Sequence, residues 1–310
     1  MSKINWVYHE NYDIPLKLNH RFTSSKFSDL FYELKKTVLY KNAIINQPKK
    51  ANIIDLSISH SVDYINKIKN GLLNYKEERK LGLTWSKRLS ERSFLAVNGT
   101  LLASKLAISN GIGCHLGGGT HHSHYDYGSG FCVFNDLAYT ALKLIESKIV
   151  KKILIFDCDV HQGDGTASIL AHDSQTFTCS IHAEKNFPVR KVESDLDVNC
   201  PDGMTDDAYI SLVFETLESV ITSWHPDFVI YDAGSDVHID DALGRLSITT
   251  DGLYRRDYGV ISRIRKAGLS CATVIGGGYD KDRARVAARH GVVISAAARI
   301  FAENTSSICL

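Results

Sequence analysis

The 310-residue sequence lacks any apolar run of roughly 18 residues, the length that a membrane-spanning helix needs. Its first residues also lack the basic segment followed by an apolar stretch that is typical of a secretory signal peptide. These absences exclude the usual sequence signatures of integral membrane and secreted proteins. We therefore expect a soluble, cytoplasmic protein without a membrane span.

An excess of charge of either sign is also missing. Lys and Arg number 36 and Asp and Glu number 35, which gives a net charge of +1. Proteins that bind nucleic acid or anionic membranes electrostatically carry a basic excess or a basic cluster. Neither is evident here, so we expect no direct nucleic-acid partner.

Proline is scarce and cysteine is scattered. Only five prolines occur, and no Pro/Ser/Gly-rich linker, long charge run or internal repeat divides the chain. We therefore expect residues 1–310 to form a single domain. The seven cysteines include no C-x-x-C pair, and several lie in apolar runs where a free cysteine acts as a small hydrophobic residue. This usage is typical of a reducing compartment.

Strand-like apolar runs alternate with amphipathic segments along most of the chain. Strands are expected at residues 4–8, 53–57, 113–116, 153–156, 176–182, 228–233 and 270–275. Helices are expected after Ser24 or Ser25, from Asn135, and at residues 59–71, 90–109, 206–223, 251–266 and 280–301, with a surface loop at 74–81. Because the strands are apolar throughout, the alternation predicts a three-layer α/β/α sandwich with a central, mostly parallel sheet.

Polar motifs follow four of the apolar runs. They are GGGTHHSH (117–124), FDCDVHQGDG (156–165), YDAGSDVH (231–238) and IGGGY (275–279). Ligands of open α/β sheets bind at the carboxyl ends of the strands, so we expect these motifs to meet there. Together they supply histidines, aspartates and a tyrosine, which is the chemistry of a metal site with an acid/base pair and a hydroxyl.

The stretch 152–166, KILIFDCDVHQGDGT, is the most informative of these. Asp157, Asp159 and His161 occupy every second position after the apolar run, and residues two apart in an extended chain share a face. Such groups are costly to bury unpaired, and a divalent cation is the simplest partner. Taken alone, however, D-x-D-x-H is more often an ordinary polar cluster at a strand end, and GGGTHH a glycine loop with surface histidines.

Five ordered motifs make the sequence resemble the zinc-dependent histone deacetylase family, which has the arginase/deacetylase fold. They are GGGTHH, GFCVFND (130–136), DCDVHQGDGT (157–166), AGSDVH and GGGY, and the resemblance runs from about His9 to the C-terminus. The segments HRF (20–22), LTWSKRLSERS (83–93) and EKNFP (184–188) are most similar to the class IV branch and its bacterial relatives.

The resemblance implies a single catalytic Zn²⁺ held by Asp159, His161 and Asp236. Three protein ligands leave an open position for water and the substrate carbonyl, as a catalytic zinc site requires. Tyr279 would donate its hydroxyl to that carbonyl oxygen.

The resemblance also implies a pair of catalytic imidazoles. His122 would be the general base and acid, and His121 its electrostatic partner. Asp157 would orient His121 and Asp164 would orient His122, which raises the basicity of each imidazole.

Two further sites follow from the resemblance. A narrow tunnel for the acylated side chain would be formed by Gly130, Phe131, Phe187 and Leu243. A structural K⁺ ion would be held by Asp157, Asp159, His161, Ser180 and Ile181.

The sequence departs from the family pattern at two places. Ser123 stands where many relatives carry Ala after the paired histidines, and Asp-Asp-Ala at 240–242 replaces the more usual Gly-Asp-Pro. The second change puts the shape of the rim loop, and so the fit of the substrate, in doubt. His124 and His238 have no matched role and are expected beside the site or at the surface.

The resemblance implies a zinc-dependent amidohydrolase that removes an acetyl or longer acyl group from the ε-amine of lysine in proteins or peptides. One alternative is a deacylase of acetylpolyamines or other small acylated amines, although the rim insertion usual in that group is not evident. Another is a catalytically silent binding or regulatory protein, whose expected signature is loss of Tyr279 or of a zinc ligand. Neither is lost. A di-manganese ureohydrolase of the same fold would need further Asp ligands.

Overall fold

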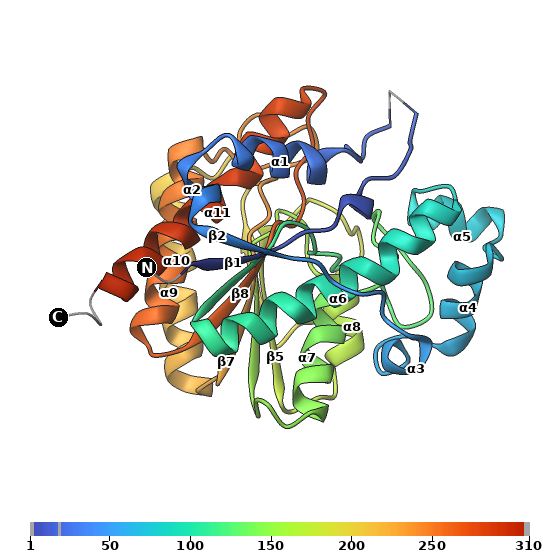
Figure 1. Ribbon diagram of the computed structural model, residues 1–310, viewed down its shortest axis with the longest axis horizontal. Coiled ribbons are helices and arrows are strands. Elements are labelled where there is room, and N and C mark those ends of the chain that lie inside the picture. The colour runs from blue at the N-terminus through green and yellow to red at the C-terminus, as the bar shows by residue number, and fades with distance from the viewer. Residues whose placement is uncertain (1–2, 18–19, 307–310) are drawn as a thin grey trace.

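A parallel β-sheet forms the centre of the molecule (Figure 1). The computed structural model describes residues 3–17 and 20–306, and these form eight strands in the order β2-β1-β3-β8-β7-β4-β5-β6, every neighbouring pair parallel. The strands are β1 (Ile4–Val7), β2 (Ala43–Asn46), β3 (Ile112–His115), β4 (Ile153–Asp157), β5 (Thr176–Ala183), β6 (Leu196–Cys200), β7 (Phe228–Asp232) and β8 (Ser270–Val274). The predicted parallel sheet is confirmed.

Helices cover both faces of this sheet. On one face α6 packs on β1, β3 and β8 and against α7, while on the other α1, α11, α10 and α9 pack side by side (Figure 1). The helices are η1 (Glu10–Tyr12), α1 (Lys26–Lys35), α2 (Val38–Lys41), α3 (Ile53–Leu56), α4 (Val62–Asn70), α5 (Tyr75–Leu81), α6 (Lys87–Asn110), α7 (Asp136–Glu146), α8 (Asp164–Leu170), α9 (Asp206–Trp224), α10 (Thr250–Lys266) and α11 (Arg283–Ser306). This is the predicted α/β/α sandwich. Within the described ranges, no helix is both long and apolar enough to cross a bilayer.

The predicted core elements form for the expected reasons. Every residue of β4 and β7 is buried, as strands covered by helices on both faces should be. The side chain of Asn135 accepts a hydrogen bond from the backbone N–H of Ala138 and so starts α7 at the predicted place. Gly71, with φ of 71°, ends α4 as predicted.

Two predictions between β2 and α6 are wrong. Residues 53–57, expected to be a strand, contain the short helix α3, because Asn52 accepts a hydrogen bond from the backbone N–H of Asp55. Residues 74–81, expected to be a loop, form α5, because Asn74 makes a reciprocal capping box with the residue three positions on. In both segments the capping side chain decides the structure, and the apolar pattern does not reveal it.

Edge strands and several boundaries also differ from prediction. The strands β2 and β6, at the two edges of the sheet, were not expected, because their mixed sequences AIIN and LDVNC lack the continuous apolar run of the central strands. The helix α6 starts earlier than expected, with Ser86 and not Ser90 as its cap. The helix α11 starts later, at Arg283.

A buried ion pair holds the carboxyl ends of β4 and β7 together. Arg256 and Asp257 are 0% and 1% exposed, and their Nε and Oδ1 atoms lie 2.8 Å apart. The guanidinium of Arg256 also donates to the backbone carbonyls of Cys158, just after β4, and of Gly234, just after β7. The hydroxyl of Tyr231 donates to Asp257 at 2.7 Å. The pair therefore fixes the segments in which two of the polar motifs lie.

Replacing Asp257 by Ala should lower the free energy of unfolding by about 3–5 kcal/mol, because the buried charge of Arg256 would lose its counter-ion. Urea unfolding followed by circular dichroism measures this change. The matched control is Asp207→Ala, which breaks a 2.7 Å ion pair with Arg255 on the surface. The control should cost much less, because solvent screens an exposed ion pair. Equal losses in the two variants would contradict the structural role of the buried pair.

Candidate active site

The four polar motifs meet at one edge of the sheet. GGGTHHSH follows β3, IGGGY follows β8, YDAGSDVH ends β7 and FDCDVHQGDG ends β4. Because these four strands are neighbours in the sheet and run parallel, their carboxyl ends lie side by side. The structure therefore brings together the residues that the sequence placed in one site.

Three buried side chains form a candidate metal centre. The ligand atoms of Asp159, His161 and Asp236 all lie within 4.8 Å of one another. The Nδ1 atom of His161 is 3.0 Å from Oδ1 of Asp159 and 3.1 Å from Oδ2 of Asp236. Two carboxylates and an imidazole are ligands that Zn²⁺ accepts, so these residues fit that ion.

The backbone around this centre fixes both carboxylates. The N–H of Gly277 donates to Oδ2 of Asp159 at 2.6 Å, and the N–H of Val160 donates to Oδ1 of Asp236 at 2.9 Å. A Cβ atom on Gly277 would lie 2.0 Å from Oδ2 of Asp236, so no larger residue fits there without moving a candidate ligand. Burial acts to lower the pKa of His161, but Asp159 and Asp236 outweigh it and raise that pKa to about 10. The two carboxylates thus strongly stabilise a positive charge at this position.

The three polar groups after β4 do not share one extended strand, as the sequence suggested. The strand ends at Asp157, and the chain bends at residues 159–161. The carboxylate of Asp157 instead lies 2.7 Å from Nδ1 of His121. Asp157 thus holds one nitrogen of His121, while the other nitrogen lies 3.8 Å from Oδ1 of Asp159, a candidate metal ligand.

Two adjacent histidines are each held by a carboxylate. Nδ1 of His121 lies 2.7 Å from Asp157, and Nδ1 of His122 lies 2.6 Å from Asp164. Their Nε2 atoms are 3.1 Å apart. Since Nδ1 is occupied in both rings, the Nε2 atoms are the ones left for chemistry.

Burial and neighbouring charges separate the two histidines in acidity. Burial, and then the positive charge of His121, lower the pKa of His122 to about 4. Burial acts to lower the pKa of His121 as well, but the charges of Asp157 and Asp159 outweigh it and raise that pKa well above its ordinary value. At neutral pH His122 is therefore neutral and able to accept a proton, while His121 is cationic. Neighbouring groups with pKa values pushed apart are typical of an acid/base pair.

Tyr279 lies close to the same centre. Its ring centroid is 6.3 Å from that of His161 and 6.0 Å from that of Phe131. Burial, and then the charge of Asp236, raise the pKa of Tyr279 well above its ordinary value, so the hydroxyl stays protonated and can donate. The backbone N–H of Tyr279 donates to Oδ2 of Asp241 at 2.7 Å.

Hydrogen bonds to Asp241 hold the rim loop that carries the Asp-Asp-Ala sequence. Oδ1 of Asp241 accepts hydrogen bonds from the N–H groups of Leu243 at 2.8 Å and Gly244 at 3.0 Å. Its other oxygen binds the backbone of Tyr279. Asp241 therefore ties the rim loop directly to the segment that carries the tyrosine.

The four predicted tunnel residues line one cavity of about 290 Å³. His122, His161 and Tyr279 line it as well. The ring of Phe187 meets that of His122 edge-on, with centroids 4.8 Å apart. Gly130 lies against the same imidazole, because a Cβ atom there would come within 2.4 Å of its Cδ2 atom. The cavity thus connects the surface with His122 of the candidate acid/base pair.

Comparison with protein families agrees with this geometry. The family model described as the histone deacetylase domain matches residues 20–294. The chain belongs to the histone deacetylase family. An uncharacterized protein of Picosynechococcus sp. is 41% identical over 295 residues, which cover 95% of this chain and 98% of that protein.

Two further relatives of this chain have lower sequence identity. Histone deacetylase 2 of Arabidopsis thaliana is 30% identical over 308 residues, covering 93% of this chain and 78% of its own. The acetoin utilization protein AcuC of Staphylococcus aureus is 34% identical over 236 residues, which cover 69% of this chain and 60% of that protein.

The fold of this histone deacetylase family member has a solved counterpart. The crystal structure of the HDA15 HD domain superposes with a TM-score of 0.77, covering 97% of this chain and 93% of that one. At 19% identity the likeness shows the fold alone. The predicted arginase/deacetylase fold is confirmed.

Two histidines left without a role by the sequence are both buried. Nε2 of His124 lies 3.1 Å from the second carboxylate oxygen of Asp164, and its ring stacks on Tyr127. His124 therefore helps to hold the carboxylate that contacts the acid/base pair. The Nδ1 atom of His238 accepts a hydrogen bond from the N–H of Asp240 and supports the rim loop.

Asp232 belongs to the site, although the sequence gave no sign of it. It is 0% exposed, and neither carboxylate oxygen has a hydrogen-bond partner. It forms a second buried group with His121 and Asp157, whose ligand atoms lie within 4.8 Å. Burial, and then the charge of Asp157, raise the pKa of Asp232 well above its ordinary value. In the motif YDAGSDVH it looked like the last residue of a strand.

Lys26 is a second residue that sequence reasoning missed. Its side chain is 3% exposed and its Nζ atom donates to the carbonyl of Gly276 at 2.8 Å. It lines a small cavity of about 30 Å³ that shares His122 and Tyr279 with the larger one. Burial, and then the charge of Arg92, lower its pKa to about 8. A lysine at the start of an amphipathic helix is expected to face solvent, so no sequence signal could have placed it here.

The predicted potassium residues also lie near one another. In the β4–β5 register Asp157 pairs with Ser180, and Ile181 is the next residue of β5. The N–H of Gly163 lies 3.4 Å from Oγ of Ser180. Binding of K⁺ at these residues stays a prediction.

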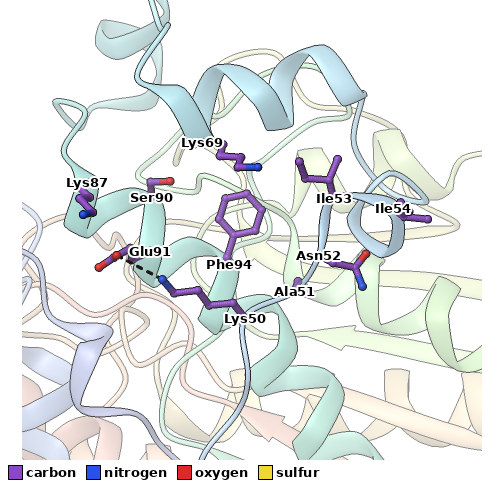
Figure 2. A pocket seen from close by; sticks show the side chains of 10 residues that line it. All are labelled: Lys50, Ala51, Asn52, Ile53, Ile54, Lys69, Lys87, Ser90, Glu91 and Phe94. Atoms are coloured by element: carbon purple, nitrogen blue, oxygen red, sulfur yellow. Dashed lines mark ion pairs between the residues drawn. The ribbon is translucent and has the colours of Figure 1, made fainter.

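A larger hollow, of about 630 Å³, lies between α3, α4 and α6 (Figure 2). Its lining includes Phe94 and Ile53, and an ion pair of 3.3 Å joins Lys50 and Glu91 at its edge. None of the predicted site residues lines it. Size alone would therefore have pointed away from the residues that carry chemistry.

Proposed function

We propose that this member of the histone deacetylase family is a zinc-dependent hydrolase that removes an acyl group from the ε-amine of lysine in proteins or peptides. The observation that carries the proposal is the donor set of Asp159, His161 and Asp236 beside two histidines that are each held by a carboxylate. The names of the Arabidopsis relative and of the matching domain support the same reaction class. The segments similar to class IV enzymes support a place in that branch as part of the proposal, in which residues 1–310 would act as one catalytic domain.

The metal would be held by Asp159, His161 and Asp236. When bound, Zn²⁺ supplies a Lewis acid that polarises the amide carbonyl and makes water acidic enough to lose a proton near neutral pH. The backbone donors of Gly277 and Val160 keep the two carboxylates in place without taking part in the reaction.

The chain's own residues would then move protons. His122 is neutral at neutral pH, so its Nε2 atom can take a proton from the attacking water and later return it to the leaving amine. Asp164 holds Nδ1 of that ring and fixes its orientation. The cationic His121 keeps a positive charge beside the site as negative charge develops on the substrate.

Tyr279 would stabilise that negative charge directly. Its hydroxyl is protonated, and a donor placed at a developing oxyanion is typically worth about 3–4 kcal/mol. Asp241 holds the backbone of this tyrosine, so the donor is positioned before the substrate arrives.

The tunnel would accept a neutral acylated side chain. Phe131 and Phe187 offer apolar walls to the aliphatic stem, and the imidazole of His122 lies against Gly130 where the acyl group would react. A structural K⁺ ion next to Asp157 and Ser180 would stiffen the strand ends below the site.

The test combines metal analysis with turnover. Purified protein should contain one Zn²⁺ per chain, and the zinc-loaded protein should cleave acetyl- or myristoyl-lysine peptides, whereas acetylated polyamines should be poor substrates. A chelator should abolish turnover, and added Zn²⁺ should restore it. His161→Ala should lose the metal, because it removes one of three ligands. Zinc-loaded protein that cleaves polyamines but no lysine peptide would overturn the proposed substrate class.

A further inference from the structure

Positive side chains surround the mouth of the substrate cavity. Arg21, Arg79 and Lys80 line the 290 Å³ cavity together with the predicted tunnel residues, and no Asp or Glu lines it. All three cations are exposed. The chain as a whole has a net charge of only +1, so this concentration is local.

The backbone holds these cations next to the tunnel wall. Arg79 and Lys80 lie in the last turn of α5, and the carbonyl of the next residue, Leu81, accepts a hydrogen bond of 2.8 Å from the N–H of Phe131. On the other side, the ring of His20, which precedes Arg21, lies 5.7 Å from the ring of Phe131. The cations therefore flank an aromatic side chain of the tunnel.

The two arginines and Lys80 differ in how far nearby carboxylates offset their charge, since Asp126 and Asp164 act on Lys80. In the part of the chain that the structure describes, neither Arg21 nor Arg79 has a carboxylate oxygen within 4.0 Å. Lys80 stacks over the ring of Tyr127, with Nζ 3.1 Å from the centroid. On the rim loop, the exposed carboxylate of Asp240 lies 3.7 Å from Arg289. The charges of Arg21 and Arg79 are thus free to act on an incoming substrate.

We infer that the substrate of this site is an acylated lysine flanked by acidic residues. The inference rests on the proposed deacylase function and narrows its substrate. Charges at the mouth lie within a Debye length, about 10 Å at 0.1 M salt, of the residues that flank a lysine inserted in the tunnel. Acidic neighbours are attracted, whereas lysine-rich segments and acylated polyamines, which carry their own positive charge close to the acyl group, are repelled.

Three peptides of equal length with one acyl-lysine test this preference. The two positions on each side of the lysine are all Glu, all Ala or all Lys. At 20 mM NaCl the zinc-loaded protein should show kcat/KM roughly tenfold higher for the Glu peptide than for the Lys peptide, as electrostatic steering commonly gives at low salt. At 500 mM NaCl the ratio should fall to about two, because salt screens exposed charges.

Charge removal identifies the residues responsible. In the double variant Arg21→Gln/Arg79→Gln the ratio at 20 mM NaCl should fall to about two, because two of the three cations are gone. The matched control is Lys69→Gln/Lys87→Gln, which removes two exposed lysines beside the separate hollow of Figure 2. The control should keep the full ratio.

The outcomes separate this inference from the proposed function. If all three peptides are cleaved with equal kcat/KM at 20 mM NaCl, or the Lys peptide is preferred, the acidic-substrate inference is wrong while the deacylase function stands. A ratio that survives the Arg21→Gln/Arg79→Gln change also overturns it. If the zinc-loaded protein cleaves none of the peptides, the proposed deacylase function and the acidic-substrate inference are both wrong.

Discussion

Replacing Tyr279 by Phe is expected to lower kcat for acyl-lysine hydrolysis by roughly 10²- to 10³-fold, the usual effect of removing one oxyanion donor. Only the hydroxyl is lost, so the ring keeps its contacts with Phe131 and His161. Zinc content and the melting temperature should therefore stay unchanged. Steady-state kinetics, metal analysis and thermal unfolding of the same preparation measure the three quantities.

The matched control for this change is Tyr139→Phe. Tyr139 is also buried, and its hydroxyl donates to Asn98 at 2.9 Å, away from the residues that line the substrate cavity. Its loss should cost stability of about 1 kcal/mol and leave kcat unaltered. If Tyr279→Phe retained kcat within a few-fold of the unsubstituted protein, the oxyanion role would have to be abandoned.

The variant His122→Ala is expected to lose roughly 10²- to 10⁴-fold in kcat, the range that general acid/base catalysis contributes. The ring is held through Nδ1 by Asp164 and is kept neutral by burial and by His121. No other neutral imidazole occupies that position among the described residues of the cavity. Zinc should still bind, because His122 is not one of the proposed ligands.

A graded variant and a control sharpen this test. Asp164→Asn keeps the imidazole but weakens its orientation, so a smaller loss of roughly 10- to 100-fold is expected, as for other residues that position a ligand or base. His172→Ala, at an exposed histidine between α8 and β5, should have no effect on kcat. Activity of His122→Ala equal to that of His172→Ala would refute the assignment of the base.

The sequence was most informative where periodicity and strand ends coincide. Parallel strands buried on both faces gave a clear apolar pattern, and placing polar motifs at their carboxyl ends correctly brought Asp159, Asp236 and His121 together. Short elements were missed for a physical reason. The helices α3 and α5 depend on one capping side chain each, and the edge strands β2 and β6 have no buried second face to produce a pattern.

The direction and burial of individual side chains could not be predicted from the sequence. The spacing of Asp157 and Asp159 suggested one extended strand, but the strand ends at Asp157. Asp157 contacts Nδ1 of His121, whereas Asp159 contacts His161 and also lies 3.8 Å from Nε2 of His121. Lys26 is buried by a contact with Gly276, 250 residues away in the chain, and Asp232 lies beside Gly119 and Gly276, which belong to two other loops. Such contacts between distant segments cannot be predicted from the residues next to Lys26 or Asp232 in the sequence.

The position of β8 has a consequence for how the protein is made. Its partners in the sheet are β3 on one side and β7 on the other, so it is the only link in the described sheet between the set β2-β1-β3 and the set β7-β4-β5-β6. It is also the last strand to leave the ribosome. Until about residue 279 has emerged, the nascent chain holds two half-sheets, each with an open apolar edge, and such edges invite pairing with other chains. We therefore expect chains truncated before β8 to aggregate more readily than the full chain.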